Sequence, residues 1–415
     1  MSSINDYIKW RGDLKLSSGH KFNELDSLIL ARFSYLIFHK IEMNKVETIE
    51  SISKKMANFK NNEFLFNGDK EMITLLGKSR RFKDLKVTDY VRNNSKKEEQ
   101  QFSALVIHIS KKSLYISFVG TDENLYGWKE DFNMAFMDEV PCQKLGTSYL
   151  TQIAQKYWYK KIRIGGHSKG GNIALYSALT ANKNIQKRII KVYNYDGPGL
   201  NESIYSKHNN KNIINKMETY LPQDSIIGAL FEHKEKITTV KSNQTFLLEH
   251  DIFSWEVLKD DLVLSTVKFN KSAGLDKAIK DYFANTTKEE RKIVLCKALS
   301  ELSADYRAVL WLVFFEEFSN KEVAAVLNKS DRQIKNLLTQ FFSNRFHCRK
   351  YRWNRLPHSG WCLDEQLFLP KNRPVNRYRK ISLSFTIWKR KFNPFNRCIS
   401  CLSPFNLELC PFFIL

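Results

Sequence analysis

The sequence has little cysteine outside its end and lacks long hydrophobic runs. Only Cys142 and Cys296 precede residue 341, so the main body has no disulfide framework. No apolar run reaches the roughly 18 residues of a membrane-spanning helix, and the polar first residues do not resemble a secretory signal peptide. We therefore expect a cytoplasmic protein without a membrane span.

Acidic residues are also in deficit. The chain has 66 Lys and Arg against 44 Asp and Glu, a net charge of +22, and half of this excess lies in residues 341–415. The remaining basic bias is compatible with nucleic acid or an anionic surface but requires neither. A hydrophobic content of 43% with 29 Phe, 17 Tyr and 8 Trp excludes a disordered chain. At about 150 residues per domain, the 415 residues predict two or three units.

The chain shows no internal repeat and divides instead by its hydrophobic pattern. Residues 1–100 are predicted to be the helical N-terminal part of the first unit, with helices over residues 24–38 and 40–57. Strands are then predicted at residues 103–110, 114–119, 161–165 and 188–195, with helices at 146–159 and 171–180. This alternation predicts an α/β core with a mostly parallel sheet over residues 101–297.

The motif Gly-His-Ser-Lys-Gly at residues 166–170 lies between a predicted strand and a predicted helix. A nucleophile elbow requires this setting, because the tight turn strains the serine backbone and leaves no room for side chains two residues away. Gly166 and Gly170 meet that demand, and Ser168 becomes the candidate nucleophile. A glycine-rich turn without chemistry is the alternative interpretation.

A nucleophilic serine needs a base and an acid, which follow it in the order Ser, acid, His in this type of fold. His250 is the best candidate base, since it follows an apolar run where a strand-end loop is expected. Asp224 is the preferred acid. Asp196 is its rival, but it follows the strand directly after the elbow helix, which is one strand earlier than expected.

Two backbone N–H groups are candidates for an oxyanion hole. Lys169 follows Ser168 at the predicted helix start, where backbone donors and the helix dipole favour negative charge. Thr121 ends the strand before the elbow, in Gly-Thr-Asp at residues 120–122. A plain hairpin exit is the alternative for that loop.

Several segments together resemble a lipase-like bacterial branch of the α/β-hydrolases, related to the class 3 lipases. They are Phe-Val-Gly-Thr-Asp at 118–122, Gly-His-Ser-Lys-Gly-Gly-Asn at 166–172, Asp-Gly-Pro-Gly at 196–199, Pro-Gln-Asp-Ser at 222–225 and His-Asp at 250–251. The resemblance covers residues 4–300 approximately and includes the opening segments 6–12 and 22–26. It implies an α/β-hydrolase fold with Ser168 as nucleophile, Asp224 as acid, His250 as base, and Thr121 with Lys169 as oxyanion hole. Class 3 lipases carry Leu at the position of Lys169.

Residues 298–340 form a different predicted unit with helix-turn-helix spacing. Ser319 with Glu322 and Ser330 with Gln333 are capping boxes for two short helices. The inward residues are predicted to be Val323, Ala324, Val326 and Leu327 in the first helix and Ile334, Leu337 and Leu338 in the second.

This unit resembles region 4 of RNA polymerase sigma factors. The resemblance implies that the second helix enters the major groove of DNA. Its residues Arg332, Gln333, Lys335 and Asn336 would then contact bases and phosphates. A helical cap on the hydrolase, without a role in DNA binding, is the alternative.

The last segment, residues 341–415, is a basic tail with 15 aromatic residues and no sustained period. Its abrupt start departs from the sigma pattern and suggests a frameshifted or recombined gene end. A zinc knuckle built on Cys398, Cys401, Cys410 and His358, or a tail that binds nucleic acid, are the other interpretations.

The sequence therefore predicts a lipase- or esterase-like serine hydrolase that cleaves an acyl ester or thioester and needs no metal or organic cofactor. Its partner is a small acyl substrate, with duplex DNA or RNA polymerase as a further partner of residues 298–340. The alternative is a sigma-like, transcription-associated DNA-binding protein whose hydrolase fold is vestigial or senses a ligand.

Overall fold

The computed structural model divides the chain into two compact units, Met1–Cys296 and Lys297–Ile414. It describes residues 2–17, 19–95, 100–121, 130, 134, 137–266, 308–309, 312 and 319–342. Most of residues 298–318 in the predicted second unit, and the tail beyond residue 342 with its cysteines, lie outside the described residues. No helix among the described residues is long and apolar enough to cross a bilayer.

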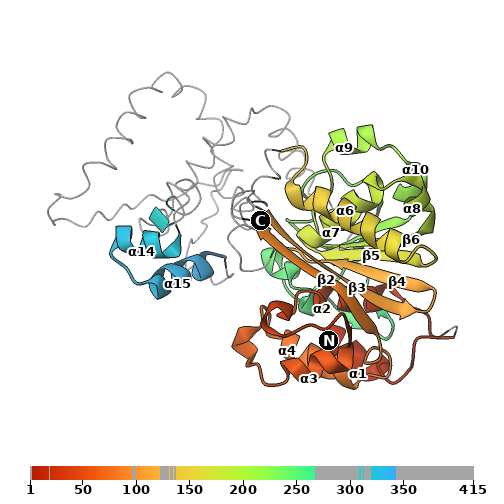
Figure 1. Cartoon of the computed structure of the whole chain (residues 1–415), viewed down its shortest axis with the longest axis horizontal. Helices are drawn as coiled ribbons and strands as arrows, with labels where there is room; N and C mark the ends of the chain where they lie inside the picture. Colours follow the sequence, from red (N-terminus) through yellow and green to blue (C-terminus); the bar gives the residue numbers. More distant parts are fainter. Residues whose placement is uncertain are drawn as a thin grey trace, which may run out of the picture. The chain divides into compact units, whose positions relative to one another are not determined.

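An eight-stranded sheet forms the centre of the first unit, with its strands in chain order (Figure 1). The strands are β1 (Val46–Thr48), β2 (Lys86–Ser95), β3 (Gln100–Ser110), β4 (Ser113–Phe118), β5 (Lys161–His167), β6 (Ile189–Tyr195), β7 (Met217–Pro222) and β8 (Lys236–Val240). The pairs from β1 to β4 are antiparallel and those from β4 to β8 are parallel. The predicted α/β core with a mostly parallel sheet is confirmed.

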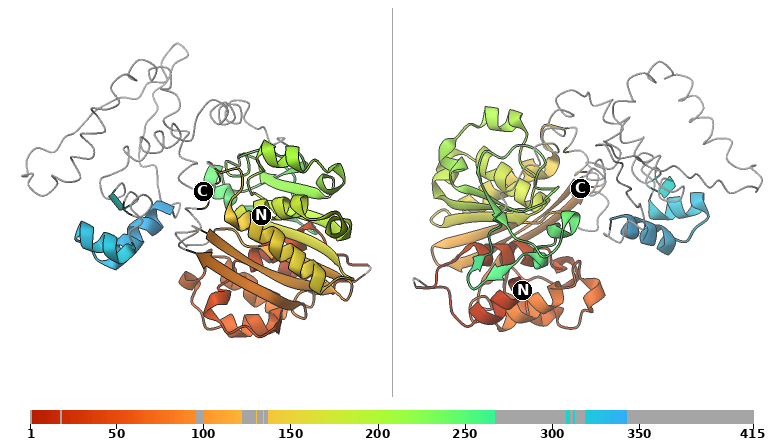
Figure 2. Two further views of the ribbon diagram at one scale, coloured as in Figure 1. Left: turned by 45° about the horizontal axis from the view of Figure 1, so that its top comes forward. Right: turned by 180° about the vertical axis from the view of Figure 1, so that it is seen from behind.

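Helices cover both faces of this sheet, as Figures 1 and 2 show. The N-terminal helices pack on one face: α1 (Ile4–Arg11), α2 (Glu24–Phe33), α3 (Ile49–Met56) and α4 (Asp69–Lys78). The other face carries α6 (Pro141–Lys156), α7 (Lys169–Thr180), α8 (Lys183–Arg188), α9 (Glu202–Lys207) and α10 (Lys211–Ile214). A second, two-stranded sheet pairs β9 (Val257–Leu258) with β10 (Asp261–Leu262).

The two hydrophobic cores follow from the alternation of side chains along a strand. In β3, Leu105 and Ile107 join the core under the N-terminal helices, whereas Ala104 and Val106 join the core under α6 and α7. The strand is buried on both faces, so its apolar run is nearly continuous, as is usual for central strands between two helical layers.

The prediction that residues 1–100 are helical is wrong for two segments, which form the strands β1 and β2. β2 was missed because its residues are largely polar and half-buried or exposed, so no clear period of two is visible. The helix predicted over residues 40–57 is also wrong in extent. The chain forms β1 first, and Thr48 Oγ1 accepts the Ser51 N–H at 3.1 Å to cap a helix of only Ile49–Met56.

In the second unit, α14 (Asn320–Leu327) and α15 (Asp331–Phe342) form the predicted helix pair. The turn between them contains Asn328 in the left-handed conformation, at φ 51° and ψ 46°. Val323, Ala324, Ile334 and Leu338 are buried and Leu327 and Leu337 are half-buried, as predicted. The inward placement of Val326 is wrong. It is 48% exposed, and the buried side of α14 runs through Val323, Ala324 and Leu327 instead.

Candidate active site

Ser168 occupies the turn between β5 and α7. Its backbone has φ 57° and ψ −135°, a region that costs a residue with a side chain about 1–3 kcal/mol. The Ser168 N–H donates to Tyr195 O at the end of β6, 2.9 Å away, and its carbonyl accepts the Gly171 N–H at 2.9 Å. The strained serine is therefore held by both the neighbouring strand and the helix that follows.

Gly166 and Gly170 leave no space for a side chain. A Cβ added to Gly166 would lie 2.3 Å from the carbonyl carbon of Gly170, and one added to Gly170 would lie 2.2 Å from Phe118 O. Both contacts are to backbone atoms, which cannot move aside without breaking the sheet or the helix. The turn has the steric demand of a nucleophile elbow.

His250 pairs with Asp196. Its Nδ1 lies 2.7 Å from Asp196 Oδ2, and the Asp196 side chain is 2% exposed. Asp196 follows β6 with a positive φ of 49°, and its N–H donates to Tyr220 O at 2.9 Å. Its other carboxylate oxygen accepts the Ser225 hydroxyl. Both oxygens of the Asp196 carboxylate thus have a hydrogen-bond partner, which fixes its orientation.

The structure does not bring Asp224 to His250, contrary to the preferred assignment from the sequence. Asp224 is exposed, and its backbone N–H donates to Glu249 Oε2 at 2.9 Å. The strand count failed because the left-handed residue at the end of β6 turns its carboxylate toward His250 directly. From the segment containing Asp224, it is Ser225 that reaches the pair.

His167 connects His250 to the elbow, a role that the sequence did not suggest. Its ring lies against the His250 ring at a centroid distance of 4.5 Å, and its Nε2 is 2.8 Å from the His250 carbonyl oxygen. A carbonyl only accepts, so Nε2 carries the proton. Burial, helped by His250 and Arg32, holds the His167 pKa well below its usual value, which keeps the ring neutral.

Ser168 and His250 both adjoin His167: Ser168 follows it in the chain, and the His250 carbonyl oxygen accepts its Nε2–H. Tyr35 Oη donates to His167 O at 2.7 Å, which holds the backbone just before Ser168. Within the described residues no hydrogen bond joins Ser168 Oγ to His250. Such contacts are often long without substrate and tighten when it binds.

The two oxyanion candidates adjoin the elbow. Lys169 begins α7, and Thr121 follows Gly120 just after β4. A Cβ on Gly120 would lie 2.0 Å from Tyr35 Oη and 2.8 Å from His167 O, so this loop is pressed onto the elbow. Residues 122–129 lie outside the described part of the chain.

The Lys169 side chain is buried beside Glu130. Lys169 Nζ lies 3.1 Å from Glu130 Oε2, and the two side chains are 3% and 0% exposed. Glu130 also accepts the backbone N–H groups of Gln101 at 3.1 Å and Cys142 at 2.8 Å. These three donors offset the cost of removing the Glu130 carboxylate from water. The ion pair also connects Glu130 to α7, which begins at Lys169. The sequence showed the unusual lysine but not its partner.

Glu249, next to His250 in the chain, is a further buried carboxyl. Its side chain is 0% exposed, and its Oε1 has no hydrogen-bond partner among the described residues. Burial raises its pKa to about 7, and the charges of Asp224 and Asp196 add to that rise. A buried carboxyl next to His250 in the chain thus has a pKa close to neutral pH.

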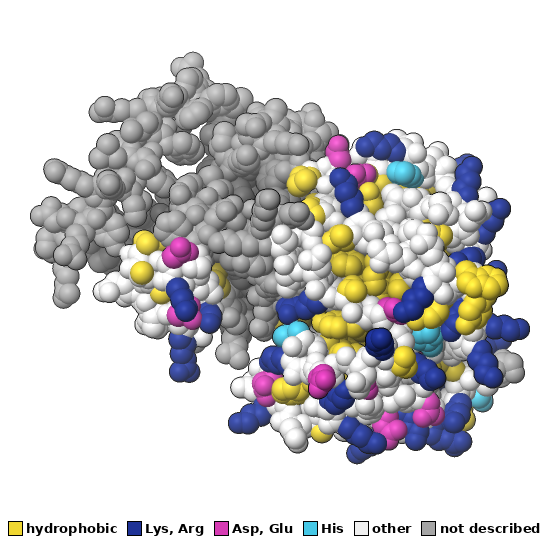
Figure 3. All heavy atoms as spheres, viewed as in Figure 1, with side chains coloured by type: hydrophobic (Ala, Val, Ile, Leu, Met, Phe, Trp, Pro, Cys, Tyr) yellow, Lys and Arg dark blue, Asp and Glu magenta, His cyan; other side chains and the backbone are white. Residues whose placement is uncertain are grey.

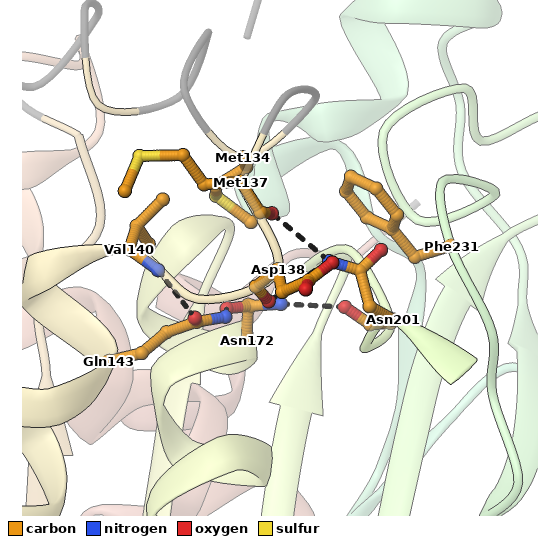
Figure 4. A pocket seen from close by; sticks show the side chains of 9 residues that line it. Met134, Met137, Asp138, Val140, Gln143, Asn172, Asn201 and Phe231 are labelled. Atoms are coloured by element: carbon orange, nitrogen blue, oxygen red, sulfur yellow. Dashed lines mark hydrogen bonds between the residues drawn. The ribbon is translucent and has the colours of Figure 1, made fainter. Parts of the chain in front are cut away.

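A small pocket opens beside the first turn of α7 (Figure 4). Gln143 and Asn172 form its floor, where Gln143 Nε2 donates to Asn172 Oδ1 at 2.8 Å. Asn201 Nδ2 closes one side by donating to Met137 O at 3.2 Å and Asp138 O at 3.0 Å. The remaining lining residues are Met134, Val140, Gly199 and Phe231. Ser168 is one turn away on the chain and does not line the pocket.

The helix pair of the second unit exposes the residues predicted to contact DNA. Arg332, Gln333, Lys335 and Asn336 are all exposed on α15. Two of them also have local partners. Gln333 Oε1 accepts the Ser330 N–H at 2.8 Å, which caps the helix, and Lys335 Nζ lies 2.8 Å from Asp331 Oδ2. Both pairs are exposed to solvent, so they compete weakly with a phosphate.

Comparison with known families gives two matches in this chain. The Mbeg1-like family model matches residues 76–299, which is more than half of the chain. The model of sigma-70, region 4, matches residues 294–340. No curated protein sequence matches.

The chain is also similar to solved structures that include lipases. A Rhizomucor miehei lipase–propeptide complex is 15% identical with a TM-score of 0.31, and the match covers 41% of this chain and 58% of that chain. MDLA from Penicillium cyclopium is 13% identical with a TM-score of 0.34, covering 63% and 92%. Lip2 lipase from Yarrowia lipolytica is 12% identical with a TM-score of 0.33, covering 58% and 82%.

Proposed function

The chain belongs to the Mbeg1-like family, which is lipase-like, and we propose that it is a serine hydrolase that cleaves acyl esters or thioesters. Ser168 is the nucleophile, His250 the base and Asp196 the acid. The observation that carries the proposal is the 2.7 Å contact between His250 Nδ1 and Asp196 Oδ2 beside a serine held at φ 57°. The substrate class is inferred from the family and the site chemistry.

The tautomer of His250 follows from its partner. Asp196 accepts a hydrogen bond from Nδ1–H, so the proton of the neutral imidazole stays on Nδ1 and the Nε2 lone pair is available to take the proton of Ser168. Oγ then attacks the acyl carbonyl, and the backbone N–H groups of Lys169 and Thr121 hold the resulting oxyanion. His250 returns the proton to the leaving group. Water then hydrolyses the acyl-enzyme by the same route in reverse.

Active-site labelling tests this proposal. The full chain is treated with a fluorophosphonate probe, and the modified residue is located by mass spectrometry. We expect an adduct on Ser168 that is lost in Ser168→Ala and kept in Ser148→Ala, a variant of an exposed serine on α6. A folded protein without an adduct, or with an adduct elsewhere, would contradict the proposed nucleophile.

A second function is proposed for the second unit, on the sigma-70 region 4 match and the exposed basic residues of α15. We propose that α15 binds duplex DNA in the major groove. Binding should weaken with salt, and Arg332→Ala with Lys335→Ala should lower the salt slope by about two phosphate contacts. Lys183→Ala with Lys187→Ala, exposed lysines of α8, is the charge-matched control. Equal DNA binding by both double variants would remove this function from α15.

A further inference from the structure

The loop between α6 and β5 exposes two adjacent aromatic side chains. Trp158 is 74% exposed and Tyr159 is 58% exposed, and their rings meet edge to face at a centroid distance of 5.6 Å. Aromatic surface of this extent costs free energy in water, and neither the fold nor the proposed active site uses it.

The backbone of this loop is firmly held. The Arg188 guanidinium donates to the carbonyl oxygens of Ala154, Tyr157 and Lys160. Tyr157 Oη donates to Asp89 Oδ2 at 2.7 Å, so the residue before the aromatic pair is also anchored. The two rings thus project from a fixed support, and binding through them would cost little backbone ordering.

Basic residues surround the aromatic pair. Lys161 follows it directly, and the Lys161 N–H donates to Lys112 O at 2.9 Å, which brings the β3–β4 turn alongside. Lys86, Lys112, Lys156 and Lys161 are exposed. Figure 3 shows Lys and Arg side chains around apolar ones at the end of the sheet where α6 finishes.

The lysines at this end of the sheet also influence one another. Lys160 Nζ lies 5.8 Å from the centre of the Tyr159 ring, and burial together with Lys86 lowers the Lys160 pKa. Burial together with Lys161 likewise lowers the pKa of Lys216. Crowded cations of this kind would be relieved by an anionic partner.

We propose that this end of the first unit, formed by Trp158, Tyr159 and the lysines around them, docks on an anionic lipid surface. Trp and Tyr favour the boundary between lipid and water. Lysine stems can lie along the headgroups while their ammonium groups contact anionic lipids. A single-stranded nucleic acid fits less well, because the two rings meet edge to face and do not offer parallel faces on which successive bases could stack.

Docking in this way would turn the proposed active site away from the bilayer. β5 is seven residues long and joins the aromatic loop to Ser168. At about 3.3 Å per residue, roughly 20 Å separates the two ends. The docked protein would take its substrate from the aqueous side, and the docking itself does not depend on catalysis.

Vesicle sedimentation tests the proposal. The full chain is mixed at low salt with vesicles of phosphatidylcholine alone or with 30% phosphatidylserine. We expect Trp158→Ser with Tyr159→Ser to weaken binding to the anionic vesicles by about ten-fold. Lys112→Glu with Lys161→Glu should weaken it by roughly five-fold or more per residue, an effect that high salt reduces. Ser168→Ala should bind as the unaltered chain does.

A matched control separates this surface from the general basic charge of the chain. Trp10, on α1, is 49% exposed and has Arg11 beside it, so Trp10→Ser removes a comparable aromatic residue at another place. We expect it to bind vesicles normally. The proposal would be overturned if the double variant, Trp158→Ser with Tyr159→Ser, bound anionic vesicles as well as the Trp10→Ser control does. It would also be overturned if the same double variant lost binding to a single-stranded oligonucleotide while its vesicle binding stayed unchanged. That result would assign the surface to nucleic acid.

Discussion

The carboxylate of Asp196 lies 2.7 Å from Nδ1 of His250, although 54 residues separate them in the chain. Ser225 and the backbone of Tyr220 hold this aspartate from the other side. The contact orients the imidazole of His250, so removing the Asp196 carboxylate should affect catalysis through the orientation of His250.

Substitutions of Asp196 and Asp224 show which of the two aspartates is the acid. We expect Asp196→Asn to lower kcat for a p-nitrophenyl acyl ester by about 10³–10⁴-fold, because the amide favours the wrong imidazole tautomer. Asp224→Asn should change kcat by less than about three-fold, since Asp224 is exposed and contacts Glu249 only through its backbone. The reverse ranking would restore Asp224 as the acid.

His167 should act as a positioning residue. His167→Leu removes the hydrogen bond to the His250 carbonyl. We expect kcat to fall by roughly 10–100-fold while KM changes little, since a small displacement of the base affects the transition state more than substrate binding. His167→Gln can donate from a similar position and should recover part of the loss. If both variants lost activity equally, a packing role would explain His167 better.

Glu249 should make stability depend on pH. Burial raises its pKa in the folded protein to about 7 from the usual 4.5, so its contribution to stability is fully present below about pH 4.5 and is lost as the pH rises through 7. Glu249→Gln cannot ionise, and it should become more stable than the unaltered chain by about 2–3 kcal/mol at pH 8 relative to pH 4.5. Urea unfolding at the two pH values measures this difference. A constant difference between the two proteins would show that Glu249 does not titrate in this range.

The buried pair of Lys169 and Glu130 should be costly to break and cheap to remove. Lys169→Met leaves the Glu130 carboxylate without its cation, and we expect a loss of about 3–5 kcal/mol in the free energy of unfolding. Adding Glu130→Gln removes the buried charge, and its one carbonyl oxygen can still accept the N–H of either Gln101 or Cys142, which donate to different oxygens of Glu130. The double variant should recover much of the loss, measured by urea unfolding in a double-mutant cycle. Strictly additive losses would show that the two charges do not interact.

The order of the central elements could be predicted from the sequence because each depends on neighbours in the chain. β3, β4, β5 and β6 are short apolar runs bounded by turns, and the α14–α15 pair has its caps within three residues. β2 could not be predicted in the same way. Its polar residues become a strand through pairing with β3, and that partner is absent from any local window.

For the candidate active site, the tight glycine turn around Ser168 could be predicted from the sequence alone, since Gly166, Ser168 and Gly170 act within two residues of one another. Tertiary structure decided which acid meets His250, because that depends on how two distant chain segments approach the end of β6. It also brought Glu130 to Lys169 and His167 to the His250 carbonyl. Side-chain pairs of this kind follow from the packing of strands and loops, and spacing along the chain does not encode that packing.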